Sequence, residues 1–516
     1  MKIYNVVRKN NYYDSVTLML ISKQLKQMEG LDDVSVMMGT PANRVILQEA
    51  NLLGPEGEAA GPNDLILAFR ALADIDVQWV LSKIDEQMGK KAATGKNAEQ
   101  LIIRSAVKAY QEDTESNLAF ISVPGEYAAI EAERALKYGK NVFLFSDNVS
   151  MEDEANLKTI AAEKGLLVMG PDCGTAIING KGIGFANKVK SGDIGLISAS
   201  GTGLQEVICL LDAMELGISQ AIGTGGRDLK EAIGAATMLQ AIELLINDNS
   251  TQTIVLISKP PAQSVVEKIM TKLAGTSKQV VLCFLGSFIA NAPSNVTIAA
   301  TLEETAIKTA LLCGKQPELL TVEAKLIDWA EEAKANLAPK QQNVRALYAG
   351  GTLCYEAMLV LSETLGPVYS NIPLRKELLT NDVVVAGQHT AIDLGDDQFT
   401  MGKPHPMIDG SLRNEYIMNV ANDQQTAVLL IDVVIGYGAS EDPAGELVPV
   451  IESAKQAAAA CGNTLAVVAY VCGTSQDEQN KEAQVAKLLQ AGVLVTTTNA
   501  EAARLARMIV GERRNS

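Results

Sequence analysis

Residues 194–203 read IGLISASGTG: an apolar strand runs into a glycine-rich turn and the start of a helix. The device occurs again at 345–352, which read RALYAGGT, and each copy continues into a helix. Three further pairs follow in the same order, namely strands 253–258 and 427–432, strands 280–286 and 467–473, and closing helices 305–312 and 500–510. Four correspondences in one order indicate two copies of a doubly wound, flavodoxin-like α/β domain.

The second copy is longer than the first. From the glycine of its Gly-Thr turn to the next central strand it has 77 residues, against 53 in the first copy. That excess is far longer than common α/β loops. We therefore predict an inserted loop over 371–420, which contains both histidines of the chain, His389 and His405.

A further α/β region precedes the two copies. Short apolar strands at 118–123, 141–145 and 166–169 alternate with helical patterns, which is typical of parallel βαβ units. In such a Rossmann-like sheet, ligands bind beyond the carboxyl ends of the strands. The loops there, 124–125, 146–147 and 170–174, are expected to face one site.

The N-terminal residues predict a small α+β unit of ferredoxin-like arrangement. We expect strands at 3–7 and 34–38, helical segments at 15–28, 41–50, 62–71 and 77–88, a loop at 54–57 and a linker at 90–99. The whole pattern predicts four domains, over 1–112, 113–190, 191–320 and 340–516.

Composition excludes several classes of function. The chain has 516 residues and a net charge of −17, and 4% of its residues are aromatic, so neither a basic face nor a base-stacking surface for nucleic acid is expected. No signal peptide and no apolar run of membrane-spanning length occurs, which favours a cytoplasmic protein without a membrane partner. Seven scattered cysteines without a CxxC pair indicate reduced thiols rather than a disulfide framework or zinc ribbon.

The two Gly-Thr turns are candidate anion sites. A helix start exposes unpaired N–H groups at the positive end of its dipole, glycine lets an anion approach, and serine or threonine adds a hydroxyl donor. The residues concerned are Ser200, Gly201, Thr202 and Gly203 in the first copy, and Gly350, Gly351 and Thr352 in the second. Ordinary helix capping is the alternative. The duplication favours anion binding.

A third glycine-rich loop contains Gly225, Gly226 and Arg227. The glycines would wrap an anion and the arginine would clamp a carboxylate or phosphate, unless the loop is a plain turn with a solvated arginine.

The inserted loop offers acid–base groups. His389 and His405 stand there among several aspartates, as candidates for proton transfer, substrate orientation or divalent metal binding. The spacing matches no specific metal motif, and structural histidines among solvated aspartates are the alternative. Cys173 is the best placed cysteine nucleophile, but both histidines are remote from it in sequence.

These residues resemble a known family. The run from Leu118 through GPDCG at 170–174, followed by Ser200-Gly201-Thr202, resembles the α subunit of succinyl-CoA synthetase, which has a CoA-binding domain and a ligase domain. This resemblance implies that CoA, if bound, would lie against Pro124, Gly125, Gly170, Pro171 and Cys173. The whole layout, including GRDL at 226–229 and the histidine segment at 402–409, resembles FdrA-type proteins. These are often labelled acyl-CoA synthetases, are tied to bacterial allantoin and purine degradation, and are implicated as a subunit of oxamate carbamoyltransferase.

One departure from the synthetase pattern bears on mechanism. Succinyl-CoA synthetases carry a phosphorylated histidine shortly after the strand that ends here at Gly286, and neither 287–295 nor 474–479 contains histidine. No ATP-grasp module is recognisable either. The first hypothesis is therefore a carbamoyltransferase subunit that moves a carbamoyl group between phosphate and oxamate, working with other subunits and as a homo-oligomer. The alternatives are an acyl-CoA synthetase or CoA-transfer enzyme, and a non-catalytic assembly subunit.

Overall fold

The computed structural model describes residues 2–11, 13, 15–26, 28, 30–71, 76–92, 105–317, 323–401 and 403–511. The chain divides into two compact units. The first comprises Met1–Asp113 with Thr400–Pro404, and the second comprises Thr114–Phe399 with His405–Ser516.

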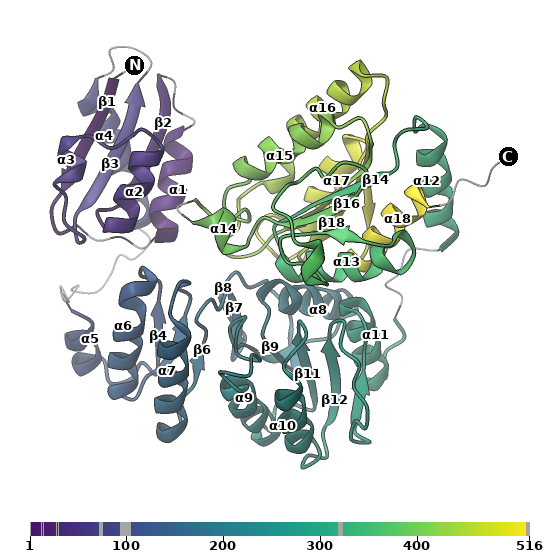
Figure 1. Ribbon diagram of the computed structural model, residues 1–516. Coiled ribbons are helices and arrows are strands. Elements are labelled where there is room, and N and C mark those ends of the chain that lie inside the picture. Colours follow the sequence, from purple (N-terminus) through teal and green to yellow (C-terminus); the bar gives the residue numbers. More distant parts are fainter. Residues whose placement is uncertain are drawn as a thin grey trace. The chain divides into compact units, whose positions relative to one another are not determined.

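The first unit is a small α+β fold on a three-stranded antiparallel sheet in the order β1-β3-β2 (Figure 1). Its elements are β1 (Lys2–Arg8), α1 (Ser15–Lys26), β2 (Leu31–Met38), α2 (Pro41–Glu49), α3 (Pro55–Glu58), β3 (Leu65–Ala71), α4 (Val77–Ala92) and α5 (Ala106–Glu112). The predicted fold class of this unit is confirmed. Most of the predicted linker at 90–99 lies outside the described residues.

Two predicted elements of this unit are wrong. The helix expected over 62–71 contains strand β3, and the loop expected over 54–57 contains the start of helix α3. Because β3 is the central strand, Leu65, Leu67 and Phe69 pack in one cluster while Ile66 and Ala68 pack in another. A strand buried on both faces has no polar alternation, so periodicity alone does not separate it from a buried helix.

The second unit begins with a parallel sheet in the order β4-β5-β6. Its elements are β4 (Leu118–Ile121), α6 (Gly125–Lys137), β5 (Asn141–Leu144), α7 (Met151–Lys164) and β6 (Val168–Met169). The alternation of strand and helix expected from the sequence is present.

The first of the two copies forms a seven-stranded sheet in the order β13-β12-β11-β9-β10-β7-β8. Its elements are β7 (Thr175–Ile178), β8 (Lys181–Gly184), β9 (Ser191–Ser198), α8 (Gly201–Ala213), β10 (Ile218–Gly223), α9 (Ala236–Asn247), β11 (Thr253–Ser258), α10 (Gln263–Leu273), β12 (Gln279–Phe284), β13 (Val296–Ile298) and α11 (Leu302–Leu312). The hairpin β7–β8, which falls in the predicted domain 113–190, pairs antiparallel with β10 of this copy.

The second copy follows helix α12 (Glu323–Ala335) and has a parallel sheet in the order β15-β16-β14-β17-β18-β19. Its elements are β14 (Asn343–Tyr348), α13 (Gly351–Leu365), β15 (Val368–Tyr369), η2 (Lys376–Leu378), β16 (His389–Asp393), α14 (Asp397–Thr400), α15 (Ser411–Asn422), β17 (Thr426–Val434), α16 (Pro443–Ala460), β18 (Ala466–Cys472), α17 (Lys481–Gln490), β19 (Leu494–Thr496) and α18 (Asn499–Val510). The stretch 371–420 therefore supplies a sheet strand and helices rather than a plain loop.

The two copies share one topology. Strands β10-β9-β11-β12-β13 of the first copy and β16-β14-β17-β18-β19 of the second lie in the same order, the 2-1-3-4-5 order of flavodoxin-like folds. The predicted duplicated α/β fold class is confirmed. The four-domain division itself stays a prediction.

The copies pack together through reciprocal helix capping by buried glutamates. Glu356 of α13 accepts the backbone N–H of Leu302 at 2.6 Å, at the start of α11 in the first copy. Glu206, at the equivalent position of α8, accepts the N–H of Asn499 at 3.4 Å, at the start of α18 in the second copy. Each carboxyl group thus faces the positive end of a helix in the other copy.

Burial raises the pKa of Glu206 to about 8 and that of Glu356 to about 7, and each is near other acidic groups. Between the ordinary glutamate pKa and these values the folded chain binds more protons than the unfolded chain. Its free energy of unfolding therefore falls as the pH rises, by about 1.4 kcal/mol per pH unit for each extra proton.

We expect the thermal midpoint of the wild type to fall between pH 5 and pH 8, and Glu206→Gln to make that fall shallower because the amide does not ionise. Thermal denaturation across this pH range measures it. Glu163→Gln, on the exposed face of α7, is the matched control and should keep the wild-type slope. An unchanged slope in Glu206→Gln would contradict the assignment.

Candidate functional site

The structure brings the two Gly-Thr turns together. Ser200 Oγ donates a hydrogen bond of 2.5 Å to Thr352 Oγ1. A methyl group added to Gly203 would lie 3.0 Å from Thr352 Cγ2, and one added to Gly350 would lie 3.0 Å from Thr202 Cγ2. The starts of α8 and α13 are therefore in direct contact. Because no space separates them, an anion bound to both would lie at the edge of this contact.

The two helix starts keep unused donors. Ser200 caps α8 by accepting the N–H of Gly203 at 2.9 Å, whereas α13 has Gly350 as its N-cap and no side-chain cap. Among the residues that the structure describes, no protein acceptor pairs with the backbone N–H groups of Gly201, Thr202, Gly351, Thr352 and Leu353. These donors, at two converging positive helix ends, suit an anionic group.

An ion pair from the inserted stretch holds the turn before α13. Asp432, on β17, accepts the N–H groups of Ala349 and Gly350, both at 2.7 Å. Arg413, on α15, donates to the Asp432 carbonyl at 2.7 Å and to its carboxylate at 3.2 Å, and both side chains are buried. Burial raises the pKa of Asp432 while Arg413 and the backbone N–H groups lower it. Neither residue was predicted, because nothing in their sequence neighbourhood links them to the turn.

Asp393 and His405 lie at the carboxyl end of β16. A methyl group on Gly351 would clash with the Asp393 carboxylate, which therefore sits at the start of α13. A methyl group on Gly395 would lie 2.6 Å from His405 Nε2 and 3.2 Å from Asp393 Oδ1, so both atoms lie beside the Cα atom of Gly395. Burial raises the pKa of Asp393 to about 7, and burial lowers that of His405 to about 4.

The tautomer of His405 follows from its contacts. Its Nδ1 accepts the N–H of Met407 at 3.2 Å, and its ring lies 5.8 Å from that of Phe185. The neutral imidazole therefore carries its hydrogen on Nε2, the atom nearest Gly395. His405 offers a donor toward the spot that it shares with Asp393.

The second histidine lies elsewhere. His389 begins β16, whereas Asp393 ends it, so His389 is at the opposite edge of the sheet from the Gly-Thr turns. Its Nδ1 accepts the N–H of Val344 at 3.1 Å, and burial together with Arg345 lowers its pKa to about 4. The structure does not bring His389 to the site.

The Arg227 side chain is already hydrogen-bonded within the protein. It donates to Glu154 Oε2 at 3.0 Å and to the Val149 carbonyl at 2.8 Å. Lys158 bonds the other oxygen of Glu154 and also Asp228, both at 2.8 Å. Two cations and two anions thus join α7 to the loop after β10. A substrate clamp by Arg227 remains a prediction, and it would compete with this pairing.

The remaining predicted residues lie in tight packing. A side chain on Gly125 would clash with the carbonyl of Asp147, one on Gly170 with that of Leu144, and one on Gly225 with that of Pro171. Gly226 has only Asp172 nearby, at 3.6 Å. Burial raises the pKa of the Cys173 thiol to about 12, so it is not an activated nucleophile. Pro124 caps α6 without a side-chain hydrogen bond.

Sequence reasoning missed Lys259. It directly follows β11, next to the end of β9, at the same edge as the Gly-Thr turns. Its charge acts on two carboxyl groups from other sheets, Asp393 and Asp172. Asp172 is accessible to solvent although protein atoms surround it closely, and desolvation together with Asp397 and Asp147 raises its pKa to about 7. The sequence feature that could have indicated Lys259 is its position at the end of an apolar strand, directly before Pro260-Pro261.

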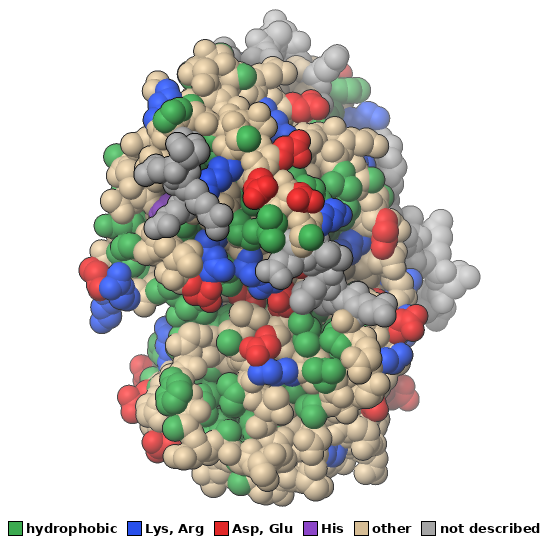
Figure 2. Space-filling model, turned by 90° about the vertical axis from the view of Figure 1, so that its right-hand side faces the viewer, with side chains coloured by type: hydrophobic (Ala, Val, Ile, Leu, Met, Phe, Trp, Pro, Cys, Tyr) green, Lys and Arg blue, Asp and Glu red, His purple; other side chains and the backbone are tan. Residues whose placement is uncertain are grey.

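No group of three or more metal-ligating side chains occurs among the described residues. In the part of the chain the structure describes, no helix is both long and apolar enough to span a bilayer. On the face shown in Figure 2, acidic and basic side chains are interspersed among the described residues rather than gathered in one basic patch.

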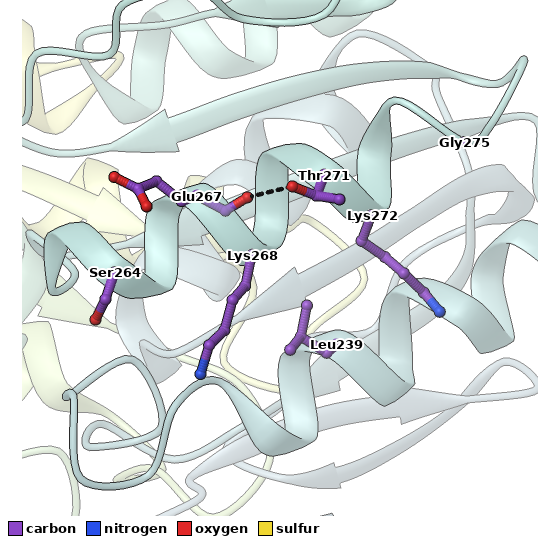
Figure 3. Close-up of a pocket in the computed structure, with 7 residues that line it drawn as sticks. All are labelled: Leu239, Ser264, Glu267, Lys268, Thr271, Lys272 and Gly275. Atoms are coloured by element: carbon purple, nitrogen blue, oxygen red, sulfur yellow. Dashed lines mark hydrogen bonds between the residues drawn. The ribbon is translucent and has the colours of Figure 1, made fainter.

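An open groove lies between α9 and α10 (Figure 3). Lys268 and Thr271 of α10 line it with Leu239 of α9, and Thr271 donates to the Glu267 carbonyl at 2.8 Å. None of the predicted site residues lines this groove, so it is separate from the Gly-Thr turns.

Comparison with known proteins finds a CoA-ligase-like region in the second copy. The sequence model described as CoA-ligase matches residues 347–509, and one described as AllF, heavy metal-associated domain, matches residues 1–102. The chain is 43% identical over 514 residues to YahF of Escherichia coli, described as an uncharacterized protein, with 99% of each chain covered. The chain therefore belongs to the YahF family.

More distant relatives match in part. The chain is 27% identical over 161 residues to the ADP-forming succinate–CoA ligase subunit alpha 2 of Archaeoglobus fulgidus, which covers 30% of this chain and 55% of that subunit. The chain thus spans about half the length of this relative. A structure of dinucleotide-forming acetyl-coenzyme A synthetase 1 from Ca. Korarchaeum cryptofilum, in complex with phosphate and ADP, covers 80% of this chain and 87% of its own, at 15% identity and a TM-score of 0.31. So loose a superposition supports no argument about the site.

The N-terminal region lacks two of the usual ligands of heavy metals. Residues 1–102, which match the heavy metal-associated domain model, contain neither cysteine nor histidine, so they offer no thiolate or imidazole to a metal.

We expect Arg413→Met to destabilise the second unit by about 3–5 kcal/mol, because Asp432 would be left buried and unpaired. Urea denaturation followed by circular dichroism measures the change. Arg375→Met is the control: its pair with Glu377 is exposed at 3.5 Å and should contribute less than about 1 kcal/mol. Equal effects of the two substitutions would show that the buried pair does not hold the turn.

Proposed function

We propose that the chain is a CoA-ligase-type enzyme that binds a phosphate or carboxylate group beside the joined starts of α8 and α13. The observation that carries the proposal is the Ser200–Thr352 hydrogen bond, which unites the two helix starts at one place. The unpaired N–H groups there would stabilise negative charge that develops on a leaving group. The class of the chain as a CoA-ligase relative supports this reaction type.

Asp393 and His405 would serve proton transfer in this site. With a pKa of about 7, Asp393 exchanges a proton near neutral pH, while neutral His405 donates through Nε2. Both face the corner at Gly395, next to the start of α13. Holding two substrates there would add proximity to charge stabilisation.

CoA would bind at the start of α6 in this proposal. Helix α6 starts at Gly125 behind Pro124 without a side-chain cap, at the carboxyl edge of β4, so its first N–H groups would hold a phosphate of the cofactor. When bound, CoA would supply the thiol for thioester chemistry. The close packing of Gly125 against Asp147 leaves the backbone N–H groups, rather than the side chains, for that contact.

Carbamoyl transfer between phosphate and oxamate is the second candidate. It is favoured by the absence of histidine after Gly286 and after Gly473, since a phosphorylated histidine at the usual place is not needed for it. Oxamate nitrogen would form the new C–N bond as the bond to phosphate oxygen breaks, and phosphate would leave toward the same N–H groups. Other subunits and further copies of this chain would complete the enzyme, and a purely structural subunit remains the third alternative.

We expect the purified chain to bind inorganic phosphate or carbamoyl phosphate, and Thr202→Val and Thr352→Val each to weaken that binding about tenfold, because each removes a hydroxyl donor to an anion. Isothermal titration calorimetry with phosphate, carbamoyl phosphate and CoA in separate titrations measures this. Thr271→Val, in the groove of Figure 3, is the control and should bind as the wild type does.

The outcomes separate the candidates. CoA binding with phosphate binding supports the ligase reaction, and carbamoyl phosphate binding without CoA binding supports carbamoyl transfer. Anion binding that the two valine substitutions leave unchanged would contradict a site at the Gly-Thr turns. An absence of binding in the presence of the partner subunits as well would favour the structural subunit.

A further inference from the structure

We propose that Lys259 is the cation that binds the anionic group of the substrate, a phosphate or a carboxylate, next to the Gly-Thr turns. This inference rests on the proposed function and adds a specificity-determining residue to it. Nothing in the family matches or the sequence motifs singles out this lysine.

The fold places Lys259 at the topological switch point of the first copy. Strands β9 and β11 are neighbours, with Ile257 opposite Ser198, and the chain leaves them toward opposite sides of the sheet. In open α/β sheets, ligands bind in the crevice at the carboxyl ends of two such strands. The first residue after β9 and β11 respectively is Ala199 and Lys259, so the lysine shares that edge with the Ser200 turn.

The backbone around Lys259 is fixed. Ala199 donates to the Ile257 carbonyl at 3.0 Å and Leu285 donates to the Ser258 carbonyl at 2.9 Å, which ties the end of β11 to both neighbouring segments. Pro260 follows directly, and a residue before proline is confined to extended backbone. Lys259 is therefore presented from a rigid strand end rather than from a mobile loop.

Two other regions of the second unit, the β4-β5-β6 region and the second copy, contribute acidic or thiol groups on which the charge of Lys259 acts. These groups are Asp172 after β6, Asp393 at the end of β16 and Cys354 in α13. Yet in the described part of the chain no hydrogen bond or ion pair engages Lys259, although it is half-buried. The buried Lys158, by contrast, has three acceptors within 3.1 Å. A partly buried lysine without an ion-pair partner in the described part of the chain, at the same sheet edge as the unpaired N–H groups, indicates a place for an external anion.

The chemistry suits a small anion with two or three oxygens. The N–H groups of α8 and α13 supply partial positive charge, and Lys259 adds a full charge at their side. Thr352 is 97% buried, accepts from Ser200 and has no acceptor among the described residues for its own hydroxyl hydrogen, so it is a further donor at this place. Lys259, Thr352 and the backbone N–H groups would together select phosphate or carboxylate over neutral ligands.

Calorimetry on the full chain with inorganic phosphate, and separately with acetate, tests the proposal. We expect Lys259→Met to weaken binding of the preferred anion at least tenfold, Lys259→Arg to restore part of it, and Lys268→Met, an exposed lysine of α10, to leave it unchanged. The tighter of the two anions identifies the group that the lysine recognises.

A labelling experiment on the wild type avoids any effect of substitution on folding. Reductive methylation with formaldehyde, read by mass spectrometry, should modify Lys259 less in the presence of the preferred anion, while Lys268 is modified equally. If the wild type binds phosphate but Lys259→Met binds it as tightly and Lys259 is not protected, this inference is wrong and the proposed function stands. If the wild type binds neither anion, in the presence of the partner subunits as well, both are overturned.

Discussion

The contact between the starts of α8 and α13 constrains the rest of the second unit. Two positive helix ends that meet repel each other, so carboxyl groups must stand near them. Asp432 accepts the N–H groups before α13, and Asp393 sits at its first residue. Further along α13 and α8, Glu356 and Glu206 each accept a backbone N–H at the start of a helix of the other copy. The two copies thus pack together through carboxyl groups of each copy that accept N–H groups at a helix start of the other copy.

The second unit contains acids of raised pKa, one of which, Asp393, lies near the neutral imidazole of His405. Burial holds the pKa of Asp393 near 7 and that of Glu206 near 8, so both groups exchange protons close to neutral pH. The histidine that shares the Gly395 corner stays uncharged over the same range because burial lowers its pKa to about 4. Positive charge at the site must then come from backbone N–H groups and from Lys259.

The sequence predicted the duplicated sheets and identified the two Gly-Thr turns as candidate anion sites, because repeats and strand-to-turn patterns are local signals. It did not predict Arg413, Asp432 or Lys259, since their roles arise from contacts between segments far apart in the chain. Strand β3 was misread because burial on both faces removes the alternation that identifies a strand. His389 and His405 are close in sequence, yet β16 runs between them and separates their environments.

The fusion of two copies in one polypeptide has a consequence for how the site assembles and diverges. A symmetric homodimer would present the same residue on both sides of its axis. Here α8 begins after a serine whose side chain caps it and α13 begins after a glycine without a side-chain cap, so the two helix starts are not equivalent. Covalent linkage also makes the union of the halves independent of dilution, because the effective concentration of one half at the other is fixed by the tether. The proposed site is therefore asymmetric, with a different set of donors from each half.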